Sequence, residues 1–124
     1  MKYIIFTCTI LIASIITLDT NAQKPAPQYL RIEFHIKPEA EVEFKSIMSS
    51  INDLMAGEEG FQSARVFHHN DNPLRVTLIE KWASLEAHQT HFKKINSNGE
   101  WMGILQMLQS DPPLVYLREA HPLP

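Results

Sequence analysis

The stretch from Arg75 to Ile95 constrains the fold most, because a strand pattern there runs directly into a helix pattern. Arg75 to Trp82 is rich in β-branched and aromatic residues and contains no glycine or proline, which is typical of a β-strand. Ser84 then suits the start of a helix, since its hydroxyl can accept a hydrogen bond from a backbone N–H one turn later. A strand and a helix joined by a very short connection are therefore predicted.

The helix that begins after Ser84 has one apolar side that also carries histidine. Residues recurring at helical spacing along this side are Leu85, His88, Phe92 and Ile95, with His91 at its edge. This pattern predicts that the helix turns two histidines toward the core. His88, in the middle of the apolar side, is interpreted first as a core histidine with a hydrogen-bond partner. His91 is either a simple boundary residue or a group at the mouth of a cavity.

The strand before this helix carries a carboxylate on an otherwise apolar face. Alternation places four residues on that face: Val76, Leu78, Glu80 and Trp82. A buried carboxylate must be paired or protonated, so Glu80 is expected to pair with His88 or His91. If Glu80 instead lies at the sheet rim, a lysine or arginine on a neighbouring strand is the expected partner.

The rest of the chain supplies three more strands and two more helices. The predicted elements are a strand 29–36, a helix 39–55, a strand 61–68, a turn 69–73, a strand 74–82, a helix 84–96, a helix 100–109 and a strand 114–119. This order predicts an α+β, ferredoxin-like fold with a four-stranded antiparallel sheet and helices on one face. Ile79 is apolar on the face that the helices cannot cover, so a second subunit is expected to pack there as a homodimer.

The first 22 residues have the pattern of an export signal. Lys2 precedes the apolar run Ile4–Leu18, and the small-residue pattern Thr20-Asn21-Ala22 follows. The alternative, a membrane anchor, is disfavoured because this run spans only ~22 Å as a helix, against a hydrocarbon core of ~30 Å. We expect a signal peptide at 1–22, a linker at 23–28, one domain at 29–119 and a tail at 120–124, in a protein that is exported, periplasmic or secreted.

Composition and motifs exclude several classes of function. The formal net charge of −3 and the lack of a basic run argue against nucleic acid as a partner. The single cysteine, Cys8, lies in the predicted signal peptide. The chain has no Gly-rich phosphate loop, no G-x-S-x-G and no dinucleotide fingerprint. His68 and His69 would point to opposite faces of a strand, and no carboxylate or cysteine motif supports His88 and His91 as ligands, so no metal site is predicted.

Several short motifs follow one another in a family-specific order. Lys37-Pro38 follows the first strand, Glu59-Gly60-Phe61 precedes the second, and Glu80-x-Trp82 precedes a helix carrying Ala87, His91 and Phe92. Together they resemble the antibiotic-biosynthesis-monooxygenase (ABM) domain family over roughly residues 29 to 119. The resemblance implies a dimeric α/β barrel that needs no cofactor.

The same resemblance implies a cofactor-independent monooxygenase that acts on quinol or phenolic aromatic small molecules with O₂. In such chemistry the deprotonated substrate itself supplies electrons to O₂, inside a dry pocket that holds a base. His91 fits the base, and Trp82 and Glu80 are the other candidate catalytic residues. The candidate substrate-binding residues are Phe34, His88, Phe92, Trp101 and Tyr116. The plainer interpretation of Trp82 and Trp101 is core packing.

Two alternatives stay open from the sequence. One is a non-catalytic ABM-like module that binds a small molecule. The other is a haem-binding or haem-degrading monooxygenase, a branch of the superfamily that uses an Asn on the first strand and a Trp on the helix after Glu-x-Trp. Here the first strand has no Asn and the helix position carries His91, so this chain resembles that branch less.

Overall fold

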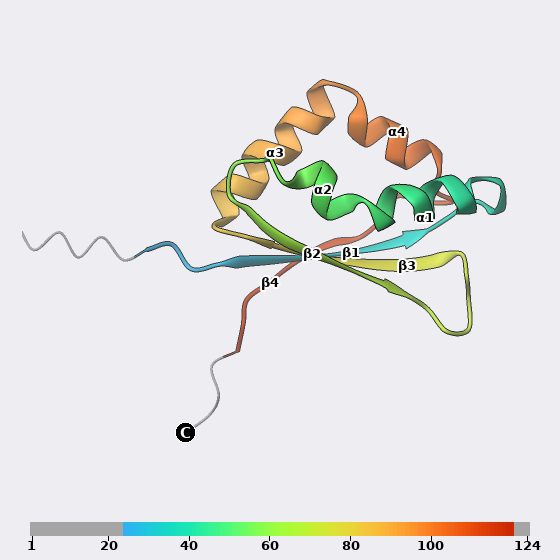
Figure 1. Cartoon of the computed structure of the whole chain (residues 1–124), viewed down its shortest axis with the longest axis horizontal. Coiled ribbons are helices and arrows are strands. Elements are labelled where there is room, and N and C mark those ends of the chain that lie inside the picture. The colour runs from blue at the N-terminus through green and yellow to red at the C-terminus, as the bar shows by residue number, and fades with distance from the viewer. Residues whose placement is uncertain (1–23, 121–124) are drawn as a thin grey trace, which may run out of the picture.

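Four antiparallel strands form one sheet in the order β2-β3-β1-β4. The strands are β1 (Gln28–His35), β2 (Phe61–His68), β3 (Arg75–Trp82) and β4 (Leu114–Leu117). In the computed structural model, which describes residues 24–120, all the helices cover one face of this sheet (Figure 1). The predicted α+β, ferredoxin-like fold is confirmed. The predicted signal peptide at 1–22 lies outside the described residues and stays a prediction.

The strand alternation places the core where the sequence pattern indicates. On β1 the buried side chains are Leu30, Ile32 and Phe34, and β3 buries every second residue from Val76 to Trp82. β1 lies at the centre of the sheet because it pairs with β3 on one side and with β4 on the other. The two central strands, β3 and β1, therefore carry most of the sheet face that packs against the helices.

The predicted helix 39–55 is wrong as a single element. It is divided into the 3₁₀ helix η1 (Pro38–Ala40), α1 (Glu41–Ser49) and α2 (Ile51–Met55). At the break, a serine hydroxyl occupies a carbonyl that an uninterrupted α-helix would offer to the Ser50 N–H. Ser49 Oγ donates to the Ser46 carbonyl at 2.7 Å, and the Ser50 N–H bonds to the Ile47 carbonyl at 3.1 Å, a tighter 3₁₀-type turn.

The two later helices begin close to where the sequence predicts. They are α3 (Leu85–Ser97) and α4 (Glu100–Gln106), the second of which ends earlier than expected. Ser84 caps α3 as expected, since its Oγ accepts the Ala87 N–H at 3.1 Å. Leu85, expected on the apolar side, is 41% exposed, so the apolar pattern does not predict its burial. The buried residues of α3 are the two histidines, His88 and His91.

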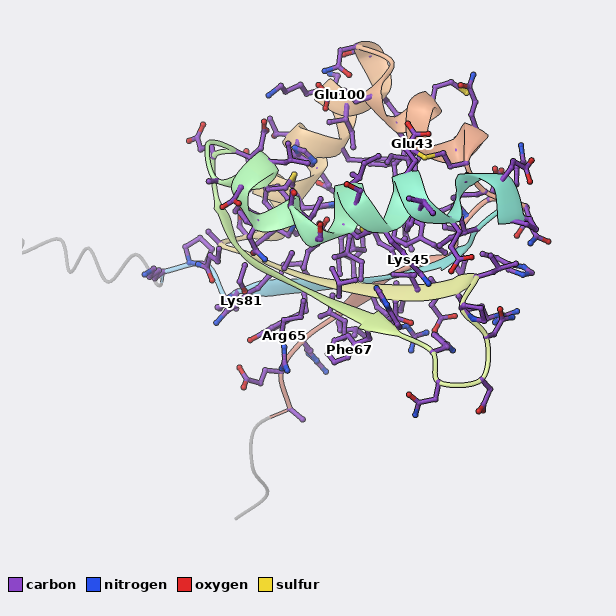
Figure 2. The ribbon with its side chains drawn as sticks, turned by 45° about the vertical axis from the view of Figure 1, so that its right-hand side comes forward. Glu43, Lys45, Arg65, Phe67, Lys81 and Glu100 are labelled. Atoms are coloured by element: carbon purple, nitrogen blue, oxygen red, sulfur yellow. The ribbon has the colours of Figure 1, made fainter. Side chains whose placement is uncertain are left out.

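The second face of the sheet is left bare by the helices of residues 24–120. Arg65 and Phe67 of β2 project from that side, away from the helices (Figure 2). Ile79 belongs to the same face because it lies opposite Arg65 and Arg31 in the strand registers. Phe67 is 41% exposed, so apolar surface remains open to solvent there. In this described part of the chain, no helix has both the length and the apolar character needed to cross a membrane.

Candidate functional site

A cavity of about 380 Å³ lies between the sheet and the helices. Its lining residues come from the sheet, from α1 and α2, and from α3 and α4. Figure 1 shows these helices lying over the same face of the sheet. Most of the lining is apolar: Ile32, Phe34, Ile47, Met48, Ile51, Leu54, Met55, Leu78, Phe92, Ile95, Trp101, Ile104 and Leu114. The ionisable lining residues are Glu58, Glu80, His88, His91 and Glu100. An apolar cavity with a few polar groups is typical of a small-molecule site.

The structure gathers most of the predicted site residues around this cavity. Those that line it are Phe34, Glu80, His88, His91, Phe92 and Trp101. Trp82 and Tyr116 are not part of the lining. Instead, the Trp82 ring lies 5.4 Å from the His88 ring and 5.0 Å from the His91 ring, centroid to centroid. Trp82 and Tyr116 therefore support the lining residues from outside the cavity.

Glu80 faces the core and is only 6% exposed, so the position at the sheet rim is excluded. The expected pairing with a histidine is wrong, because the hydrogen bond comes from the Trp82 Nε1–H, whose donor atom lies 2.8 Å from Glu80 Oε2. The indole reaches the carboxyl because the two residues occupy the same face of β3. Burial raises the pKa of Glu80, and the indole hydrogen bond and the nearby charge of His91 only partly oppose this. Glu80 therefore holds a proton more readily than an ordinary glutamate.

His88 is held among aromatic rings. It is 2% exposed, and its Nδ1 lies 2.8 Å from the Tyr116 hydroxyl. Burial, with a smaller contribution from the charge of His91, lowers the pKa of His88 to about 4. Burial, with the negative charge of Glu80, raises the pKa of the Tyr116 phenol. His88 and Tyr116 thus form a neutral pair at neutral pH, in agreement with the interpretation of His88 as a core histidine.

His91 has an ionised partner instead. It is 8% exposed, and its Nδ1 lies 3.0 Å from Glu58 Oε2. The second carboxylate oxygen, Oε1, accepts a hydrogen bond from Lys94 Nζ at 2.6 Å. The hydrogen bonds from Lys94 and then from His91 hold the pKa of Glu58 below its usual value. With Nδ1 engaged by Glu58, Nε2 is the ring nitrogen that remains for another partner.

Glu58 reaches His91 because its turn packs tightly against α3. Gly60 has a positive φ of 80°, and a Cβ added there would lie 2.5 Å from the Ala87 Cβ. The Gly60 carbonyl also accepts the Ala83 N–H at 2.7 Å. Only glycine fits this close approach with this backbone conformation. Sequence reasoning missed Glu58, although the motif Glu59-Gly60-Phe61 marks the turn that carries it.

The residues around the cavity limit the kind of ligand that it can bind. No group of three or more histidine, cysteine, aspartate or glutamate side chains that could hold a metal ion occurs within residues 24–120. The cavity walls include the aromatic faces of Phe92 and Trp101, whose rings meet edge to face at 5.4 Å. Such a cavity can take a flat apolar molecule and bring it against the His91 imidazole and the Glu80 carboxyl.

Solved structures from more than one organism have the same fold as this chain. A conserved protein from Methanosarcina mazei Go1 superposes with a TM-score of 0.67 at 19% identity, covering 80% of this chain and 98% of that chain. A mutant form of SnoaB, a cofactor-independent oxygenase from Streptomyces nogalater, superposes with a TM-score of 0.62 at 16% identity, covering 78% and 98%. At such low identity these likenesses establish the fold alone. No curated protein is close enough in sequence to match this chain.

The family assignment comes from the sequence of the domain itself. Residues 27–94 match the family model described as Antibiotic biosynthesis monooxygenase. The match includes β1, both strands of the β2–β3 hairpin and the part of α3 that carries His88 and His91. It therefore spans more than half of the chain and includes both buried histidines of the cavity. The chain belongs to the antibiotic biosynthesis monooxygenase family.

Proposed function

We propose that the protein is a cofactor-independent monooxygenase that oxidises a quinol or related phenolic compound with O₂. The observation that carries this proposal is the placement of His91, whose Nδ1 is engaged by Glu58 while its ring borders an apolar cavity. Family membership supports the reaction class, and the aromatic walls support a flat substrate. The proposal also fits the name of SnoaB, which has the same fold.

The reaction begins with a proton transfer. His91 Nε2 takes the proton of a substrate hydroxyl, and the electron pair of that O–H bond stays on the substrate oxygen. The electron-rich anion then reduces O₂ and gains one oxygen atom, while the second leaves as water, so that a hydroquinone and O₂ give a hydroxyquinone and water. Glu80, whose pKa is raised by burial, donates a hydrogen bond to the developing oxyanion.

We also propose that the working unit is a homodimer that closes over the bare face of the sheet. Apolar side chains are open there, with Phe67 41% exposed, and Ile79 lies on the same face. Sheet-to-sheet packing by a two-fold axis would bury this patch on both copies.

Sedimentation velocity tests the dimer. The wild type should sediment as a dimer, and Phe67→Ser should weaken it because a buried apolar contact is lost from both copies. Val42→Ser, which changes an 84% exposed residue on the helix side, is the matched control and should leave the dimer intact. A wild type that stays monomeric at micromolar concentration contradicts the dimer.

The test of function is oxygen consumption with a panel of hydroquinones. Wild type and His91→Ala are compared, with the folded fraction of each measured by circular dichroism. General-base assistance is typically worth ~10²–10⁴-fold, so the variant should turn over at least about 10-fold more slowly. Labelled ¹⁸O₂ should place one oxygen atom in the product and one in water.

The other outcomes separate the alternatives. Equal turnover per folded molecule in both proteins would refute His91 as the base. No oxygen uptake, together with saturable quenching of tryptophan fluorescence by the same compounds, would favour a binding module, because Trp101 lines the cavity. An absorbance band of protein-bound haem after stoichiometric titration would instead favour the haem-dependent alternative.

A further inference from the structure

A second hollow lies on the outer side of the His91 wall. Its volume is about 610 Å³, and it is bordered by polar residues of the Gly57–Gly60 turn and of α3, among them Glu59, Glu86 and Lys94. Glu58 and His91 line both this outer hollow and the inner apolar cavity. The pair therefore forms part of the partition between an apolar interior and a polar exterior.

Exposure rises in order along the chain of hydrogen bonds that crosses this partition. The His91 side chain is 8% exposed, that of Glu58 22%, and that of Lys94 57%. Glu58 Oε2 meets His91 Nδ1 at 3.0 Å and Oε1 meets Lys94 Nζ at 2.6 Å. Both oxygens of the carboxylate are thus engaged, one by each neighbour, which fixes its orientation toward the imidazole.

The chemistry of the partner decides the tautomer of His91. An ionised carboxylate can only accept hydrogen bonds, so the shared hydrogen must be bonded to Nδ1. A neutral His91 then has its lone pair on Nε2. The hydrogen bonds from Lys94 and His91 also keep Glu58 ionised, since they lower the pKa of its carboxyl group. His88 has no such constraint, because the Tyr116 hydroxyl can donate or accept.

We propose that Glu58 is a positioning residue, which holds His91 in the tautomer with a free Nε2 and stabilises the imidazolium that forms when His91 takes a proton. The role rests on the proposed function in that the proton comes from the substrate. In that step the substrate O–H bond breaks, the Nε2–H bond forms, and the positive charge faces the Glu58 carboxylate. The ionisable groups that face His91 are Glu58 from the turn before β2, Glu80 from β3, and His88 and Lys94 from α3.

The first measurement needs no turnover. Long-range ¹H–¹⁵N spectra of the ¹⁵N-labelled protein report which ring nitrogen of His91 carries the hydrogen. The wild type should show the Nδ1–H tautomer when His91 is neutral. In Glu58→Gln the side-chain amide can donate to Nδ1, so the Nε2–H tautomer should become populated. Glu59→Gln is the matched control, because Glu59 is the adjacent carboxylate and also borders the outer hollow. It should keep the wild-type tautomer.

The second measurement is steady-state oxygen uptake with a hydroquinone. Glu58→Gln should lower kcat roughly 10-fold or more with little change in KM, because Glu58 acts on the proton transfer through His91 rather than on substrate binding. Glu59→Gln should leave both constants unchanged. A wild-type Nε2–H tautomer, or a Glu58→Gln protein with an unchanged tautomer, would overturn the positioning role. If the wild type consumes no oxygen, the proposed function fails, while the spectra still decide whether Glu58 sets the tautomer.

Discussion

His88 and His91 lie less than one turn apart on the buried side of α3, yet they have different neighbours. His88 meets a phenol, and its pKa is lowered to about 4, chiefly by burial. His91 meets a carboxylate that Lys94 keeps ionised. Both residues line the same cavity and both rings pack against the Trp82 indole. The two histidines therefore differ in the partner of Nδ1, which is a phenol for His88 and an ionised carboxylate for His91.

The largest expected effect is a loss of stability on substitution of Trp82, whose indole packs against both histidine rings. Trp82 is wholly buried, and its Nε1–H is the hydrogen-bond partner of Glu80. Trp82→Ala should lower the free energy of unfolding by about 3–5 kcal/mol, because a large cavity opens and Glu80 loses its donor. Urea denaturation measures this. Trp101→Ala is the control, since Trp101 is only partly buried and should cost clearly less. If both variants lose the same free energy of unfolding, the buried contacts of Trp82 have no special role in stability.

The next largest effect is the pH dependence of stability that His88 contributes. A folded-state pKa of about 4, against an ordinary value of 6.5, means that the unfolded chain binds more protons between these two pH values. The stability contributed by neutral His88 is therefore complete above pH 6.5 and falls as the pH drops toward 4, by roughly 3 kcal/mol in all. Urea midpoints measured across this range should rise more steeply with pH in wild type than in His88→Gln. Parallel curves for the two proteins would refute the buried, neutral His88.

Two carboxyl groups also make stability depend on pH. Glu58 has a lowered pKa, so its contribution is present above the ordinary value of 4.5 and is lost only at more acidic pH. Glu80 has a raised pKa, so its effect has the opposite sign and weakens the fold as the pH rises from the ordinary value through its folded-state value. The difference between wild type and His88→Gln isolates the His88 contribution from both.

The smallest expected effect is on the phenol that pairs with His88. Tyr116→Phe removes the hydroxyl 2.8 Å from Nδ1 and should lower the free energy of unfolding by about 1 kcal/mol. Urea denaturation at neutral pH measures the loss. Tyr29→Phe is the control, because the Tyr29 hydroxyl only reaches an exposed Glu119 oxygen at 3.4 Å. If both variants lose the same stability, the hydrogen bond to His88 contributes nothing of its own.

Local patterns were enough to predict the strands and the order of the elements. Alternation along β1 and β3 and the Ser84 cap are properties of neighbouring residues, and the structure agrees with them. The break at Ser50 was not predicted, because it depends on the Ser49 hydroxyl taking the Ser46 carbonyl, which apolar spacing does not reveal. The exposure of Leu85 was missed for a similar reason: periodicity gives a direction but not the edge of the core.

In the candidate site, too, local patterns predicted some residues and could not predict others. His88 and His91 were found because their own helix turns them inward. Glu58 was not found, and Tyr116 was named only as a candidate substrate-binding residue and not as the partner of His88, since each partner comes from a distant part of the chain. Glu58 lies in a turn that Gly60 allows to pack closely against α3, and Tyr116 lies on β4. The positions of both side chains therefore depend on how the whole sheet is assembled. The Glu80–Trp82 hydrogen bond lay within reach of sequence reasoning, because the two residues share one face of a strand.

The most direct test of His91 as the proton acceptor is the ionisation state of a bound phenol. A nitrocatechol, whose phenol and phenolate absorb at different wavelengths, is mixed with the protein without oxygen, at a pH where the free compound is neutral. We expect the phenolate spectrum on wild type and on His88→Gln, and the neutral spectrum on His91→Gln, because His91 is the residue that takes the proton. A neutral ligand bound to wild type, or a phenolate that persists in His91→Gln, would contradict this assignment.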